Sequence, residues 1–214
     1  MKIGIIGTGT VGQTLGTGLI KLGHEVKIGS RNPQKPEVQT WLKNNGNKAT
    51  AGSFAEAATF GEVVFICTSW AGTQQAIQLA EPKNFKGKVV VDVTNPLDFS
   101  QGMPPTLAVG HTTSGGEMVQ QWLPEAKVVK AFNIVTAAYM INGKFPEGNL
   151  DMFIAGNDEA AKKTVTDFLT AFNWNTHDMG GIEQARIIEP FAMLWITWGA
   201  RNNTWTHAFK LLKK

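Results

Sequence analysis

The chain has 214 residues, of which 43% are hydrophobic and 17% charged, and its formal net charge is +3. These values are typical of an ordinary globular protein, and the charge is too small to favour nucleic acid as a partner. Cys67 is the only cysteine, which excludes an intramolecular disulfide and a cysteine-based metal cluster and fits a cytoplasmic location. The first apolar run stops at Gly7, and no run reaches the roughly 18 residues of a membrane span. We therefore expect neither a signal peptide nor insertion into a membrane.

Short apolar runs alternate with longer segments of helical spacing along the chain. The runs predict strands over residues 2–6, 25–28, 63–67, 88–93, 127–130, 151–155 and roughly 173–177. The helical spacing predicts helices over residues 10–22, 36–45, 69–79, 114–122 and 158–172. Because the runs are continuous and β-branched, we expect strands that are buried on both faces. The pattern predicts an α/β fold of the Rossmann type, with a doubly wound, mostly parallel sheet, as one domain over residues 1–214.

The first predicted strand leads directly into a glycine-rich turn and then into a helix. The turn reads Gly7, Thr8, Gly9, Thr10, Val11 and Gly12, which is the spacing of a dinucleotide-binding turn in its strand–turn–helix context. Gly7 permits the tight turn, Gly9 lets a pyrophosphate approach the backbone, and Gly12 lets the helix pack on the strand. The alternative is a glycine-rich turn without a ligand. We expect the N-terminus of this helix to bind the phosphates of a dinucleotide.

The end of the second predicted strand decides between the two nicotinamide cofactors. NAD-binding proteins carry a carboxylate about 20 residues beyond the glycines, where it binds the ribose 2′-hydroxyl. This chain has Ser30 and Arg31 there and no acidic residue. Ser30 can donate a hydrogen bond to a 2′-phosphate, Arg31 can pair with it, and Lys35 can add a third contact. Arg31 and Lys35 as solvated loop charges are the alternative, but their position favours NADP(H).

Ligands of an open parallel sheet lie beyond the carboxyl ends of its strands. We expect cofactor contacts from Thr68, Ser69 and Trp70 after one strand, and from Asn95 and Pro96 after the next. Helix caps and turn residues are the alternative assignment for both groups.

No pattern predicts a metal site or a catalytic nucleophile. His111 lies in a loop rich in Gly, Ser and Thr that could close over a substrate. A histidine there can transfer protons, but a lone loop histidine more often makes a hydrogen bond or faces water. We therefore predict no metal and no essential acid or base from the protein.

The C-terminal stretch, residues 182–214, is expected to be an aromatic-rich helical segment packed on the domain. Its apolar residues fall close to one helical stripe: Phe191, Leu194, Trp195, Trp198, Trp205, Phe209 and Leu212. Such a stripe ordinarily packs on the core, and it also suits the wall of a flat pocket or the seam of a dimer. Because one helix with three tryptophans offers a large apolar surface, we predict a homodimer through this segment.

Several stretches together resemble the NADP oxidoreductase family dependent on coenzyme F420, which is similar to the cytosolic domain of six-transmembrane ferric reductases. They read GIIGTGTVGQTLGTGLIKLGHEVKIGSR, VVVDVTNPL, TTSGGEMVQQWLPEAKVVKAFNIV and DMFIAGNDEAAKK followed by IEQARIIEPFAMLWI. The resemblance covers nearly the whole chain. It implies a single Rossmann-type domain that exchanges hydride between NADP(H) and a deazaflavin, with cofactor contacts that include Ala131.

Three functions stay open at this point. The favoured one is a cytoplasmic NADP(H)-dependent oxidoreductase that transfers hydride between NADP(H) and a ring-type small molecule, a deazaflavin or a flavin. The second is a reductase of a small imine or carbonyl substrate. The third is a non-catalytic NADP(H)-binding regulator, in which Trp70 or the tryptophan-rich C-terminal stretch blocks the nicotinamide face.

Overall fold

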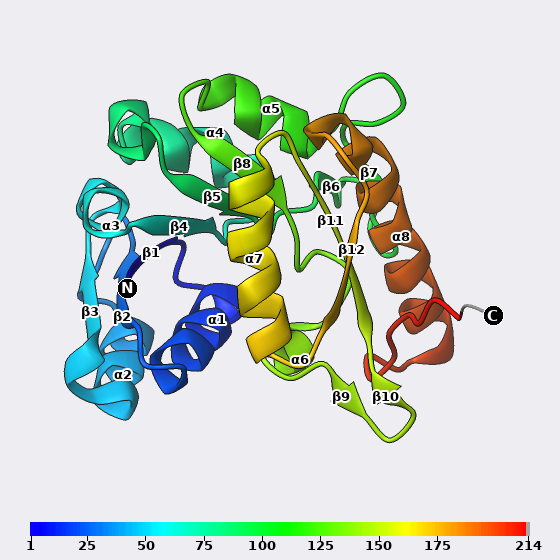
Figure 1. The fold of residues 1–214 in the computed structure, drawn as a ribbon, viewed down its shortest axis with the longest axis horizontal. Helices are drawn as coiled ribbons and strands as arrows, with labels where there is room; N and C mark the ends of the chain where they lie inside the picture. The colour runs from blue at the N-terminus through cyan, green and yellow to red at the C-terminus, as the bar shows by residue number, and fades with distance from the viewer. Residues whose placement is uncertain (213–214) are drawn as a thin grey trace.

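An eight-stranded sheet forms the centre of the molecule in the computed structural model, which describes residues 1–212 (Figure 1). The last two residues of the predicted domain and of its C-terminal segment, 213 and 214, lie outside the described residues. The strand order is β12-β11-β8-β5-β4-β1-β2-β3. Neighbouring strands are parallel except β8 and β11, which are antiparallel. The predicted α/β fold with a mostly parallel sheet is confirmed. The strands are β1 (Lys2–Ile6), β2 (Glu25–Gly29), β3 (Ala49–Gly52), β4 (Val63–Ile66), β5 (Val89–Asp92), β8 (Lys127–Lys130), β11 (Asp151–Gly156) and β12 (Asn175–Asp178).

Helices cover both faces of this sheet (Figure 1). The helices are α1 (Thr10–Lys21), α2 (Pro36–Asn45), α3 (Phe54–Phe60), α4 (Trp70–Leu79), α5 (Gly115–Trp122), α6 (Ala137–Met140), α7 (Glu159–Ala171) and α8 (Ala185–Asn202). Two small hairpins lie outside the sheet, β6 (Leu97–Asp98) with β7 (Thr106–Leu107) and β9 (Lys144–Phe145) with β10 (Gly148–Asn149). Within the described range, no helix combines the length and the apolar character that crossing a membrane requires.

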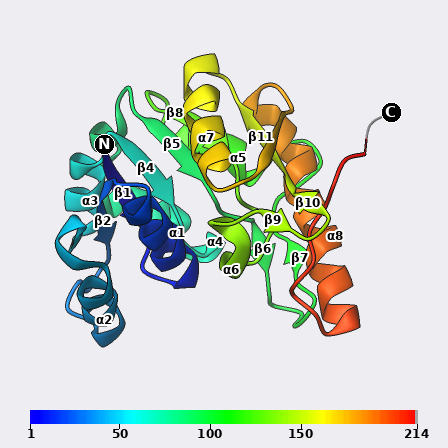
Figure 2. The same cartoon turned by 60° about the horizontal axis from the view of Figure 1, so that its bottom comes forward.

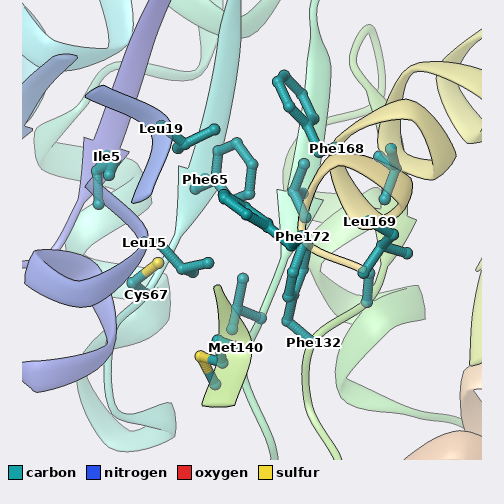
Figure 3. Close-up of a cluster of buried hydrophobic side chains, with 14 of the residues drawn as sticks. Ile5, Leu15, Leu19, Phe65, Cys67, Phe132, Met140, Phe168, Leu169 and Phe172 are labelled. Atoms are coloured by element: carbon teal, nitrogen blue, oxygen red, sulfur yellow. The ribbon is translucent and has the colours of Figure 1, made fainter. Parts of the chain in front are cut away.

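The side chains of the strands alternate between two apolar cores. In β1, Ile3 and Ile5 pack into one core with residues of α1, α2 and α7, whereas Ile6 packs into the other with α3, α4 and α5. Figure 3 shows the centre of the first core, where Phe65 of β4 meets Phe132 beyond the end of β8. Their ring centroids are 6.2 Å apart. This two-sided burial explains why the strands read as continuous apolar runs.

One strand of the central sheet, β3, and the helix that follows it, α3, were not predicted, and neither were the short helix α6 and the two small hairpins. The sequence of β3 is ATAG, which has no β-branched apolar run, and the strand pairs only with β2 at the edge of the sheet. The following α3 begins with a capping box, in which the Glu56 N–H donates to the Ser53 hydroxyl and the Ser53 N–H donates to the Glu56 carboxylate. The spacing of Ser53 and Glu56 was therefore a usable signal for this helix.

The predicted helical stripe of the C-terminal stretch is wrong beyond Asn202. Helix α8 ends there, Asn203 takes a left-handed conformation, and residues 204–212 turn back along α8 without helical structure (Figure 2). Trp205, Phe209 and Leu212 consequently do not share a helix with Phe191, Leu194, Trp195 and Trp198. Two contacts hold residues 204–212 against α8. The Trp195 indole N–H donates to the His207 carbonyl at 2.8 Å, and the rings of Phe191 and Phe209 stack with centroids 4.1 Å apart.

Candidate nucleotide-binding site

Two adjoining cavities lie at the carboxyl ends of β1, β2, β4 and β5. The first, of about 330 Å³, is lined by predicted residues from three strand ends: Gly7, Thr8, Gly9, Ser30, Arg31, Lys35, Thr68 and Ser69. The second, of about 240 Å³, is lined by the predicted Val11, Thr68, Ser69, Trp70 and Asn95, together with Val93, Thr94, Leu97 and Phe99. Cys67, Thr68 and Ser69 line both cavities. The structure thus brings most of the predicted site residues to one edge of the sheet.

Four of the predicted residues line neither cavity. Thr10 is exposed at the start of α1, whereas Gly12, Pro96 and Ala131 are buried behind the site. His111 is also outside both cavities, exposed on its loop with φ of 61°.

The glycine-rich turn is shaped by close backbone contacts. Gly7 has φ of +123°, and a Cβ atom at this position would lie 2.6 Å from the Cys67 carbonyl oxygen. A Cβ atom at Gly12 would lie 2.5 Å from the Gly7 carbonyl oxygen, so this glycine lets α1 approach the turn. At Gly9 a Cβ atom would meet no atom within 4 Å and would occupy the open space of the first cavity. Gly7 and Gly12 are therefore required by packing, while Gly9 leaves room for a ligand.

The N-terminus of α1 faces this open space. Gly9 is its N-cap, no side chain of the described residues caps it, and its first turn contains no acidic residue. The free N–H groups and the positive end of the helix dipole are suited to an anionic group.

The basic edge of the first cavity lies beyond β2. Ser30 is held in place because its N–H donates to the Gly52 carbonyl at 2.9 Å and its hydroxyl accepts from the Asn32 N–H at 3.1 Å. Lys35 lies 3.8 Å from the Glu37 carboxylate, and both side chains are well exposed. Arg31 is exposed and has no carboxylate partner among residues 1–212. Arg31 is therefore the cation best available to a ligand in this cavity.

Trp70 forms a flat wall of the second cavity. Its ring stacks on Trp122 with centroids 5.6 Å apart and an angle of 26° between the planes. Nearby, the hydroxyls of Thr68 and Thr73 lie 2.8 Å apart. Trp70, the first residue of α4, thus packs against the last residue of α5, and the second cavity lies beside it.

Among residues 1–212, Cys67 is the only one with a titratable side chain that lines the second cavity. Burial raises the pKa of its thiol far above the ordinary value, and the nearby Asp92 carboxylate adds to this shift. Because the thiolate is the nucleophile, this residue is unreactive near neutral pH. Among the described residues, no group of three or more His, Cys, Asp and Glu side chains is arranged to hold a metal ion.

A buried charged cluster behind the second cavity was not predicted from the sequence. The Lys130 ammonium lies 2.6 Å from the Asp92 carboxylate and 2.7 Å from the Glu189 carboxylate, and all three side chains are at most 1% exposed. Burial lowers the pKa of Lys130, but the attraction of the two carboxylates outweighs it, so the net shift is upward. The three charged residues come from β5, β8 and α8. The sequence signal for the cluster was limited to Asp92 and Lys130, which each follow a short apolar run.

Comparison with known proteins agrees with this geometry. Residues 2–96 match the model of the family described as NADP oxidoreductase, coenzyme F420-dependent. An F420-dependent NADP reductase of Methanocaldococcus jannaschii is 37% identical over 92% of this chain and 91% of its own length. The rat Metalloreductase STEAP3 is 31% identical over 88% of this chain, and the chain spans only 36% of that protein. A crystal structure provisionally described as an F420-dependent NADP reductase of Arthrobacter sp. FB24 superposes with a TM-score of 0.94 over the whole of both chains, at 39% identity.

The Rossmann-type sheet, the cavities at its strand ends and these relatives together define an NADP-dependent oxidoreductase. The chain belongs to the family of coenzyme F420-dependent NADP oxidoreductases. The resemblance seen in the sequence motifs is confirmed over nearly the whole chain.

Proposed function

We propose that the protein transfers hydride between NADP(H) and a ring-type acceptor, and that the acceptor is the deazaflavin coenzyme F420 or, failing that, a flavin. The observation that carries the proposal is the pairing of a basic first cavity with a second cavity walled by flat and apolar side chains. Trp70, Leu97 and Phe99 supply those walls. Names of relatives in the family support the deazaflavin over the flavin.

The residues of the first cavity fit NADP(H). The glycine turn and the N-terminus of α1 would hold the pyrophosphate, since Gly9 leaves the required space. Ser30 and Arg31 would hold the 2′-phosphate, with Lys35 as a weaker partner because it is shared with Glu37. When bound, NADPH supplies a hydride from its nicotinamide ring.

The second cavity supports a ring acceptor over an isolated carbonyl or imine. Reduction of a carbonyl localises charge on one oxygen, and a positioned acid typically contributes about 10²–10⁴-fold to such a reaction. Among the described lining residues only the Cys67 thiol is titratable, and its raised pKa makes it a poor acid. Hydride transfer to a conjugated ring spreads the charge and depends mainly on alignment. The open cavity beside Trp70 likewise supports an enzyme over a regulator with a blocked nicotinamide face.

The proposal is tested by NADPH oxidation with a panel of acceptors at equal concentration: coenzyme F420, FMN, FAD, a ferric chelate and a small cyclic imine. We expect F420 to give the highest kcat/KM, with a flavin second. Fastest turnover with the imine, or none with any acceptor despite tight NADPH binding, would overturn the proposal. NADH in place of NADPH is the matched control for the cofactor.

The homodimer and the cytoplasmic location stay predictions. The exposed apolar side chains Ile187, Leu194 and Trp198 of α8 support association with a second copy, although the shortened helix makes this surface smaller than predicted. The single cysteine, Cys67, is the one feature that supports the compartment.

A further inference from the structure

We infer that Lys130, with Asp92 and Glu189, is a positioning group that fixes Thr94 and Asn95, which follow β5 and line the second cavity, where the nicotinamide ring of the proposed reaction would lie. The inference rests on the proposed hydride transfer, because it assigns these buried charges to the alignment that this reaction needs. None of the three side chains lines either cavity, so they act through other residues.

Thr94 is hydrogen-bonded to two members of the cluster, Lys130 and Asp92. The Lys130 ammonium donates to the Thr94 carbonyl at 2.8 Å. The Asp92 carboxylate accepts from the Thr94 N–H at 3.0 Å and from its hydroxyl at 2.7 Å. Both backbone groups and the side chain of Thr94 are therefore fixed by charge-assisted hydrogen bonds, which are the stronger kind. Since Thr94 lines the second cavity, its position sets the shape of that wall.

The next residue, Asn95, is held by a parallel set of contacts. Its side-chain amide donates to the Asn133 carbonyl at 2.7 Å, and the Asn133 amide donates to the Asn95 side-chain oxygen at 3.0 Å. The Asn133 amide also donates to the Ile188 carbonyl of α8 at 3.2 Å. Asn133 follows Phe132, whose φ of 63° is uncommon for a bulky residue and indicates backbone strain held by its surroundings.

Glu189 connects this wall to the start of α5. Its two carboxylate oxygens accept from the Gly115 and Gly116 N–H groups at 2.8 Å each, while one of them also contacts Lys130. A Cβ atom at Gly116 would lie 2.9 Å from the Ala185 side chain and 3.2 Å from the Lys130 side chain, so this approach is close. The Glu189 carboxylate in the IIEPF stretch thus joins the glycine pair of the TSGGE stretch to the Lys130 ammonium.

Stability alone does not account for the cluster. Replacing a buried ion triad by apolar residues of similar size is often neutral or stabilising, because removing the charges from water costs about as much as their attraction returns. What such a cluster provides is a fixed geometry. Here the hydrogen bond of Lys130 goes to Thr94 in the cavity wall, and its two ion pairs go to Asp92, which also binds Thr94, and to Glu189, which binds the start of α5.

The test compares Lys130→Met with Lys162→Met in the full chain. Lys162 is the matched control, because its side chain is 6% exposed and also contacts two carboxylates, those of Glu159 and Asp178, but it lies on α7 away from both cavities. Three quantities are measured: the Kd for NADPH, the fluorescence of the bound nicotinamide without acceptor, and the single-turnover rate of hydride transfer to coenzyme F420.

For Lys130→Met we expect the transfer rate to fall about ten- to a hundredfold, as a misplacement of the order of 1 Å can cause. The emission enhancement of bound NADPH should fall as well, while its Kd changes by less than about threefold, since the first cavity is untouched. Lys162→Met should leave all three quantities near the wild-type values.

An unchanged rate and emission in Lys130→Met, or an equal loss in Lys162→Met, would overturn the inference. If Lys130→Met does not fold, Glu189→Gln replaces it, because it keeps the volume and the Asp92–Lys130 pair and should show the same pattern at smaller size. If the wild-type protein transfers hydride to neither F420 nor a flavin, the proposed function fails, and the acceptor-free emission still decides the positioning inference.

Discussion

Replacement of Arg31 by alanine is expected to remove most of the preference for NADPH over NADH. Arg31 lines the first cavity beyond β2, where no carboxylate is present to bind a ribose 2′-hydroxyl. A charged hydrogen bond contributes about 1.5–3 kcal/mol. Because Arg31 is exposed, solvent screening favours the lower end, about 1.5 kcal/mol, which corresponds to roughly a tenfold loss of NADPH affinity.

Lys35→Ala should have a smaller effect, because Lys35 is also exposed and is shared with Glu37 at 3.8 Å. We expect the affinity for NADPH to fall by about twofold, which is typical of the loss of an exposed ion pair. Lys43→Ala is the control, since Lys43 lies on α2, which begins directly after Lys35, but outside the cavity, and it should change the affinity for neither NADPH nor NADH.

Titration calorimetry with NADPH and with NADH, for each variant, measures these effects. NADH affinity should be nearly the same in all four proteins. Equal affinity of the wild-type protein for NADPH and NADH, or an equal loss of both in Arg31→Ala, would show that Arg31 does not bind the 2′-phosphate.

Four further predictions concern the turn, the loop, an ion pair and the assembly. Gly9→Ala should keep the wild-type Tm, because its Cβ meets no atom within 4 Å, yet weaken NADPH binding by filling the cavity; a large loss of Tm in thermal melts would contradict this. His111→Ala should lower kcat by less than about tenfold in steady-state assays, since a general acid contributes more; a thousandfold fall at unchanged NADPH affinity would favour a carbonyl or imine reductase. The hydrogen bond from Arg186 lowers the pKa of Glu117 from its ordinary value of 4.5. The ionised Glu117 therefore stabilises the fold above that pH, and this contribution is lost as the pH falls below it. Denaturant titrations should accordingly show that the free energy of unfolding of Glu117→Gln depends less on pH in the acid range than that of the wild-type protein. Light scattering at micromolar concentration should give the mass of a dimer, and a monomer mass would reject the association surface on α8.

The parts of the fold set by local sequence could be predicted, and those set by distant partners could not. The turn from Gly7 to Gly12 was predicted because its spacing reflects contacts within a few residues. Strand β3 was missed because its four small residues carry no apolar pattern and it is a strand only by pairing with β2. The helical stripe was extended too far because aromatic spacing continued past the polar stretch at Asn202 and Asn203, where the helix ends.

The site divides in the same way. That Arg31 and Ser30 lie beside the glycine-rich turn could be predicted, because the end of β2 fixes their place relative to the glycines. The grouping of Asp92, Lys130 and Glu189 could not, because the positions are far apart in the chain and spacing does not report which charges meet in the interior. A lysine at the end of a buried strand indicates that some partner exists, but not which one.

The returning C-terminal segment also closes a strand edge. Strand β11 pairs with β8 only through its last two residues, Ala155 and Gly156. The first residues of β11 therefore have no neighbouring strand on the side of β8. The Asp151 N–H donates instead to the Phe209 carbonyl at 3.2 Å, and the Asp151 carboxylate accepts from the Leu211 N–H. Open strand edges are templates for pairing with other chains. Residues 209–211 therefore cover the start of β11. A protein that lacked them would expose unpaired backbone groups of β11, which favour aggregation, even though its nucleotide cavities would be intact.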